Sequence, residues 1–140
     1  MRSVRFTVKP LRVVIAVFLL ASTLTVAGAL SASKITGIYS NLRFNDEGGD
    51  LLGMEILVLP RESKGGTSAT YNVVVQIADG GAPYVVVVPL EWMGDHFDCP
   101  LSAGDYGGQH LTLRFQGSEL LVLWPGGNQE KLKRGKSYWQ

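Results

Sequence analysis

The sequence predicts an all-β domain, an antiparallel meander of about six to eight strands that closes as a small barrel or folds into a sandwich. The first observation is a set of paired glycines at recurring intervals, which mark turns because glycine reaches positive φ without a steric clash. The second is that the runs between these turns are short and rich in β-branched and aromatic residues, with no helical periodicity after residue 32. The pairs are Gly48-Gly49, Gly65-Gly66, Gly80-Gly81, Gly107-Gly108 and Gly126-Gly127.

An export segment precedes this domain. Four basic residues and no acid occupy the first twelve positions, an uncharged apolar run spans 13–30, and small residues fill 27–29 and 31–32. A basic start, an apolar middle and small residues at the end are typical of a signal peptide. The run is also near the lower length limit for a helix that crosses a hydrocarbon core of ~30 Å.

Two alternatives therefore stay open for the N-terminus. Residues 1–32 are a signal peptide that is removed, or they form a hydrophobic anchor helix that keeps the protein on the membrane. In both cases the basic residues stay in the cytoplasm and the domain 33–140 is exported, to the periplasm or the medium. We expect membrane contact only through residues 13–30, and only if they are retained.

The expected strands follow one another with short connections. Alternation is clearest in 71–77, where the odd-numbered residues face inward, and in 111–116, where Leu111, Leu113 and Phe115 share one face. The runs 85–88 and 120–123 are apolar on both faces, which is typical of central strands or of strands that line a cavity. We expect strands at 35–44, 53–59, 70–78, 84–92, 110–116, 119–124 and 130–134, with a long connection over 95–108.

Turn chemistry favours the meander, and edge chemistry favours the barrel. Gly117-Ser118 is typical of a two-residue type II′ hairpin loop, and residues 79–82 close another hairpin. Closure would remove the exposed edges of strongly β-prone runs such as 84–88. The tripeptide Gly37-Ile38-Tyr39 resembles the Gly-x-Trp signature that opens lipocalin barrels, with tyrosine in place of tryptophan. That resemblance implies a lipocalin-like barrel shape and nothing about function.

Charge and cysteine content exclude several classes of protein. The whole chain has 13 basic and 12 acidic residues, but four of the basic ones precede residue 33, so the exported part is acidic. An acidic, exported body without a recognised module argues against nucleic-acid binding. The basic residues 131–136 are expected to protect a sheet edge, or alternatively to touch anionic lipid or glycan. The single Cys99 excludes an intrachain disulfide, so stability must come from the core.

One cluster of reactive side chains lies within 95–110. Imidazole and thiolate groups are ligands for Zn²⁺ or copper, so His96, Asp98, Cys99 and His110 are candidate metal ligands. The alternative is an ordinary solvated loop, because polar residues accumulate in connections. Cys99 with His96 is a weak candidate for a nucleophile and base. Hydrolase, zinc-protease and phosphate-loop motifs are absent, so we expect no enzyme, no catalytic residues and no cofactor.

The predicted function is binding. A non-enzymatic exported barrel would hold a small apolar or amphipathic ligand, or an envelope component, between its apolar strand faces. The tryptophans and tyrosines would either stack on a sugar or apolar ligand or fill the core. The alternative is an interaction or inhibitor module that contacts an envelope protein through the 94–108 loop or a sheet edge. The cavity candidates are Val73, Val75, Val86, Trp92, Leu113 and Phe115.

Overall fold

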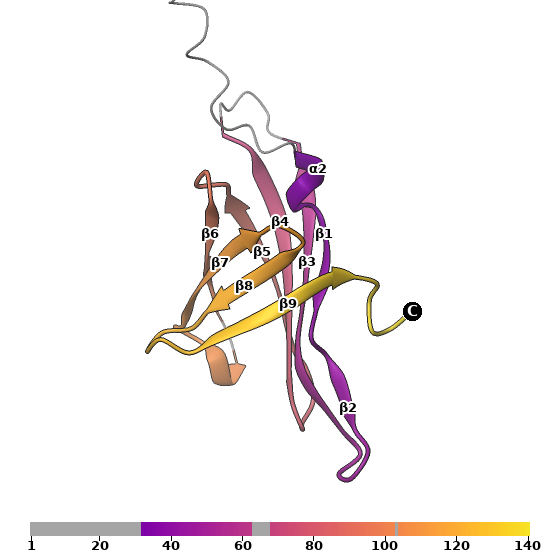
Figure 1. Cartoon of the computed structure of the whole chain (residues 1–140). Coiled ribbons are helices and arrows are strands. Elements are labelled where there is room, and N and C mark those ends of the chain that lie inside the picture. The colour runs from indigo at the N-terminus through magenta and orange to yellow at the C-terminus, as the bar shows by residue number, and fades with distance from the viewer. Residues whose placement is uncertain (1–31, 63–67, 103) are drawn as a thin grey trace, which may run out of the picture.

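The computed structural model describes residues 32–62, 68–102 and 104–140, and these form an antiparallel, nearly closed barrel of eight strands with a short additional strand (Figure 1). The predicted signal or anchor helix and the Gly65-Gly66 pair lie outside the described residues. In the described part of the chain, no helix is both long and apolar enough to cross a membrane. The elements are α2 (Ala32–Ile35), β1 (Gly37–Ser40), β2 (Arg43–Asn45), β3 (Asp50–Arg61), β4 (Thr70–Asp79), β5 (Tyr84–Glu91), β6 (His96–Pro100), the 3₁₀ turn η2 (Gly104–Tyr106), β7 (His110–Gln116), β8 (Glu119–Leu123) and β9 (Gln129–Gly135).

The strand order confirms the antiparallel meander and the barrel. Hydrogen-bonded neighbours run β5-β4-β3-β1-β9-β8-β7-β6, and β2 pairs with β3 as an extension beyond β1. The first and last strands pair with each other, so β1 lies between β3 and β9. The order leaves β5 and β6 at its two ends, and these strands meet at the seam where the barrel is not closed by a ladder.

The core fills the barrel from both halves of the meander. On β4 the alternation is as predicted, with Tyr71, Val73, Val75 and Ile77 buried and the residues between them half-buried. Leu111 and Leu113 of β7 are buried as well. Ile35 of α2 is 1% exposed and joins the same cluster, so α2 packs over the end of the barrel where β1 begins (Figure 1).

Two predicted turns are confirmed. Gly117-Ser118 joins β7 to β8 as a two-residue loop, and only the glycine has a positive φ, of 63°, as a type II′ turn requires. The β4–β5 hairpin turns at 80–83, with Gly80 at φ 97°. The short 80–83 connection sets the register in which β4 pairs with β5.

The expected long connection over 95–108 is wrong in its first part, because residues 96–100 form β6. This strand pairs with β7, with Phe97 opposite Leu113 and Cys99 opposite Leu111. Phe97 and Cys99 face inward with no exposed surface, while Asp98 and Pro100 face outward. The polar residues that suggested a loop are the outward half of an alternating strand.

The expectation that 85–88 forms a central strand is also wrong. β5 is an edge of the strand order, and Val85 and Val87 face solvent with exposures of 56% and 60%. A run of consecutive valines has no period, so the sequence could not show that one face is open. The run 120–123 does lie in a central strand, β8, between β7 and β9.

The first expected strand, 35–44, is interrupted. Residue 35 belongs to α2, and the strand is interrupted between β1 and β2 at Asn41. The Asn41 side-chain Oδ1 accepts a hydrogen bond from the Met54 backbone N at 2.6 Å. The basic residues 131–136 do not protect an edge, because β9 has a partner on each side. These corrections share one cause. Tertiary pairing decides which strands become neighbours, and local sequence patterns do not reveal that pairing.

Candidate ligand pocket at the open end of the barrel

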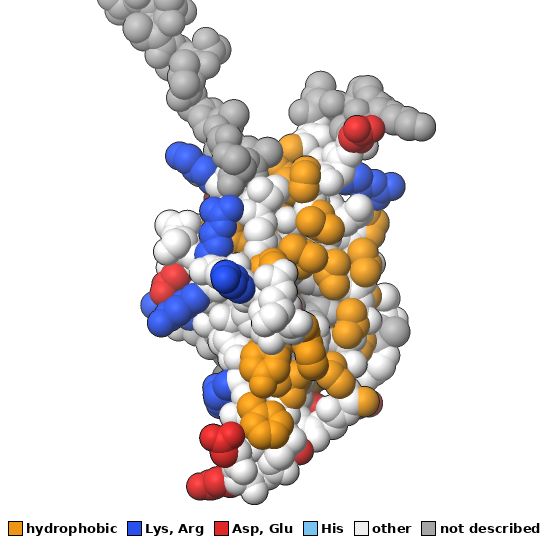
Figure 2. Space-filling model, turned by 90° about the vertical axis from the view of Figure 1, so that its right-hand side faces the viewer, with side chains coloured by type: hydrophobic (Ala, Val, Ile, Leu, Met, Phe, Trp, Pro, Cys, Tyr) orange, Lys and Arg blue, Asp and Glu red, His pale blue; other side chains and the backbone are white. Residues whose placement is uncertain are grey.

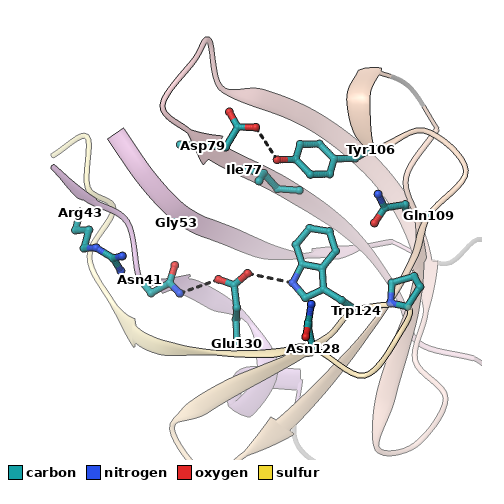
Figure 3. A pocket seen from close by; sticks show the side chains of 12 residues that line it. Asn41, Arg43, Gly53, Ile77, Asp79, Tyr106, Gln109, Trp124, Asn128 and Glu130 are labelled. Atoms are coloured by element: carbon teal, nitrogen blue, oxygen red, sulfur yellow. Dashed lines mark hydrogen bonds between the residues drawn. The ribbon is translucent and has the colours of Figure 1, made fainter. Parts of the chain in front are cut away.

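A pocket of about 540 Å³ opens at the end of the barrel opposite α2 (Figure 3). We call this end the mouth. It is formed where β4 ends, where β7 begins and where β8 turns into β9, so its side chains come from separate segments of the chain. The lining residues are Asn41, Arg43, Gly53, Ile77, Ala78, Asp79, Tyr106, Gln109, Trp124, Pro125, Asn128 and Glu130.

Glu130 organises one wall of the mouth. Its two carboxylate oxygens accept hydrogen bonds from the Trp124 indole Nε1 and from the Asn41 amide Nδ2, each at 3.0 Å. Asn41 is itself fixed by Met54 N on β3. The indole therefore has a defined orientation, because a charged acceptor holds its only donor.

Gly53 allows Asn41 to come this close. Its φ is 108°, a conformation that other residues rarely adopt, and a Cβ atom there would lie 2.8 Å from the backbone oxygen of Asn41. The position therefore needs glycine both for its backbone and for the close approach. The sequence showed this glycine only as the first residue of an expected strand.

Aromatic rings build the second wall. The centroids of Tyr106 and Trp124 are 5.8 Å apart with planes inclined at 48°, and Tyr84 packs behind Tyr106 at 5.4 Å. The Tyr106 hydroxyl donates a hydrogen bond to Asp79 Oδ2 at 3.0 Å. Burial, and then the bond to Asp79, raise the pKa of Tyr106, so this phenol remains a neutral donor at physiological pH.

The mouth combines ring faces with a circle of hydrogen-bonding groups. Asp79 and Glu130 lie on opposite sides, the Gln109 amide lies near Tyr106, the Asn128 amide lies beside Trp124, and Arg43 lies at the rim (Figure 3). Neither histidine nor cysteine lines this pocket. Such a lining suits stacking and hydrogen bonding of a ligand.

The cavity candidates from the sequence occupy the core above the mouth. Val73, Val75 and Leu113 have no exposed surface, and the other candidates, Val86, Trp92 and Phe115, are half-buried against the same cluster. The Trp92 ring packs on Phe97 and Phe115, at centroid distances of 5.0 and 5.6 Å. None of the six lines the pocket at the mouth.

The candidate metal ligands lie on different faces. Cys99 points into the core, where burial raises its pKa to about 12, while His96 and Asp98 are on the outer face of the same strand. His96 Nδ1 lies 2.6 Å from Asp95 Oδ1, and His110 is at the far end of the β6–β7 pair, opposite Pro100. Across residues 32–62, 68–102 and 104–140, no three His, Cys, Asp or Glu side chains gather as a metal site would need.

The sequence contained only a partial signal for the mouth. Trp124 and Tyr106 were among the aromatic residues expected to stack on a ligand or to fill the core, but their polar neighbours were not singled out. Asn41, Gln109 and Asn128 lie in breaks and turns, where polar residues are ordinary. Only the barrel geometry shows that they converge.

Comparisons with known proteins add no relative to this picture. No family model matches the sequence, and neither the curated proteins nor the solved structures gave a significant match. The geometry of the mouth is therefore the basis for interpreting its chemistry.

Proposed function

We propose that this protein is an exported, non-enzymatic barrel domain that binds a small amphipathic ligand at its mouth, with a saccharide of the cell envelope as the best-fitting class. The observation that carries the proposal is the Trp124 ring, held by Glu130 at the edge of a pocket with polar groups around it. The predicted export segment supports an envelope location.

The pocket suits an amphipathic ligand better than a wholly apolar one. Its volume of about 540 Å³ falls within the usual range for small-molecule sites. A sugar ring offers C–H faces that pack on aromatic rings and hydroxyls that pair with carboxylates and amides. A purely apolar ligand would instead displace water from Asp79, Arg43 and Glu130 without offering hydrogen bonds in return, which is costly.

The experiment is a binding screen with soluble envelope oligosaccharides, measured by calorimetry on the exported protein. Trp124→Ala should weaken binding at least about 30-fold, because it removes the stacking surface and the partner of Glu130. The matched control is Trp139→Ala, since Trp139 is 59% exposed and does not line the pocket. Equal effects of the two variants would contradict the proposed site, and a wholly apolar ligand retained through purification would contradict the saccharide class.

A second candidate function is a protein-interaction module. One observation favours it, the exposure of Val85 and Val87 on the edge strand β5. Apolar edge strands are binding sites for other chains. Pull-down from an envelope extract with Val87→Glu as the negative control tests this candidate.

A further inference from the structure

The outside of the barrel carries an apolar face that the proposed pocket does not use. Strand register places Ile38, Leu57, Val74 and Val87 in one row across β1, β3, β4 and β5. Leu59 and Val85 extend this row on either side, and Leu59, Val85 and Val87 are more than two-fifths exposed. Together these six residues form what we call the outer apolar face, and Figure 2 shows the side of the molecule on which hydrophobic side chains gather.

The C-terminal tail covers a carboxylate in the middle of this face. Glu55, beside Leu57 on β3, is just 9% exposed, and its carboxylate accepts hydrogen bonds from Ser137 Oγ at 2.6 Å and Tyr138 N at 2.9 Å. The Trp139 indole donates a hydrogen bond to Gln76 Oε1 at 3.2 Å. Gln76 is on β4, where it pairs with Glu55 of β3 on one side and with Val85 of β5 on the other.

The tail covers a carboxylate and displays aromatic rings in its place. Tyr138 and Trp139 remain 41% and 59% exposed on the outside of the barrel. On an ordinary solvated sheet face, charged side chains are exposed and large apolar side chains are covered. Here the carboxylate is covered and the rings and valines are exposed. Exposed aromatic anchors in an apolar surround are typical of protein interfaces.

Charge differs between the two ends of the face. The upper end, where β3 finishes, has Lys34, Arg61 and Arg134, whose guanidinium donates to the Lys34 carbonyl oxygen, with Glu62 and Glu91 as opposing acids. The lower tip of the β2–β3 hairpin has Asp46, Glu47 and Asp50, with Arg43 as the opposing base. Figure 2 shows acids at the lower end and most of the bases above and to the left, with further acids at the upper right and on the left.

We infer that the outer apolar face binds the same face of a second copy of this chain, with the strands of the two copies antiparallel across the interface. A two-fold axis in the plane of the face and perpendicular to the strands places the basic end of each copy against the acidic tip of the other. The opposite orientation would bring like charges together. A lipid surface fits less well, because an anionic bilayer would meet Asp46, Glu47 and Asp50 along with the apolar residues.

Sedimentation of the full protein, with the N-terminus that the cell leaves on it, tests the association. Wild-type protein should be a dimer at micromolar concentration, and Val87→Glu should raise the dissociation constant at least about 30-fold. The control is Met93→Glu, since Met93 is 59% exposed but lies in the β5–β6 turn, outside the face. A wild-type monomer at about 100 µM, or equal effects of the two variants, would overturn the inference.

Cross-linking tests the orientation. Chains with Arg61→Cys mixed with chains with Asp50→Cys should form a disulfide between copies, whereas Arg61→Cys alone should not. The native Cys99 is buried and does not compete. A disulfide between two Arg61→Cys chains would overturn the antiparallel arrangement. If monomers bind phosphatidylglycerol vesicles and Val87→Glu abolishes that binding, the inference that a second copy occupies this face would be overturned.

Discussion

The two ends of the barrel are built from different chemistry. At the upper end α2 packs over the strands, Ile35 is buried, and the Tyr39 hydroxyl donates to the Ile35 carbonyl oxygen at 3.1 Å. At the mouth the chain leaves about 540 Å³ open, and its side chains are carboxylates, amides and rings. One barrel therefore has an apolar, filled section and a polar, hollow section.

This difference separates stability from binding. The filled section holds the residues whose burial drives folding, since each fully buried large side chain contributes about 1.5–3 kcal/mol. The mouth holds polar groups that stabilise little and that need not change when the core is altered. Substitutions in the two sections should therefore affect different measurements.

The largest expected effect is on stability, from Phe97→Ala. Phe97 has no exposed surface and packs against the rings of Tyr71, Trp92 and Phe115, at centroid distances of 5.3, 5.0 and 5.9 Å. Its truncation leaves a cavity, so the free energy of unfolding should fall by about 3–5 kcal/mol in urea denaturation. Ligand affinity of the protein that remains folded should be unchanged.

Phe44→Ala is the matched control, because Phe44 is 52% exposed at the β2–β3 hairpin. Its effect on unfolding should stay within about 0.5 kcal/mol. If Phe97→Ala were tolerated equally well, the filled section would not be the source of stability and the contrast between the ends would fail.

A smaller effect is expected from alkaline pH. Burial raises the pKa of Cys99 from 9.0 to about 12, so between these values the unfolded chain loses a proton that the folded protein keeps. Stability that is present below pH 9 should therefore decline as pH rises toward 12, by about 2 kcal/mol at pH 10.5. Burial raises the pKa of Tyr39 and Tyr71 too, which adds loss in the same direction.

Urea midpoints at pH 8 and pH 10.5 measure this decline. Cys99→Ala removes one of the titrating groups, so its stability should fall less between the two pH values than that of the wild type. An identical fall in both proteins would show that the thiol is not held in the low-dielectric core that its position on β6 indicates.

The sequence predicted the strands whose two faces differ. Leu113 on β7 alternates with polar residues, and on β4 the polar Asn72 and Gln76 indicate the outward face even though Val74 lies between Val73 and Val75. The inward orientation of these strands followed from the two patterns. Val85 and Val87 belong to a run of four valines, 85–88, so the sequence could not show which face is open. β6 was missed because Asp98 and Pro100, its outward residues, are typical of loops.

The mouth was less predictable than the core. Trp124 lies just after β8 and Glu130, six positions later, lies on β9, while Asn41 reaches Glu130 from 89 positions away. Such a site depends on the closure between the first and last strands. Closure itself was expected from the edge argument, but the register that brings Asn41 next to Glu130 was not.

A substitution with a smaller expected effect on stability than Phe97→Ala or alkaline pH tests the mouth itself. Tyr106→Phe keeps the ring beside Trp124 and removes only the hydroxyl that donates to Asp79. This bond is exposed, so its loss should lower the free energy of unfolding by no more than about 1 kcal/mol. Affinity for the saccharide should fall by about 3- to 10-fold, less than for Trp124→Ala, because the stacking surface remains while Asp79 loses the partner that orients it. Calorimetric titration beside urea denaturation gives both numbers on one preparation. A loss of stability as large as that of Phe97→Ala would make the mouth a continuation of the core, and the division of the barrel into a filled end and a binding end would no longer hold.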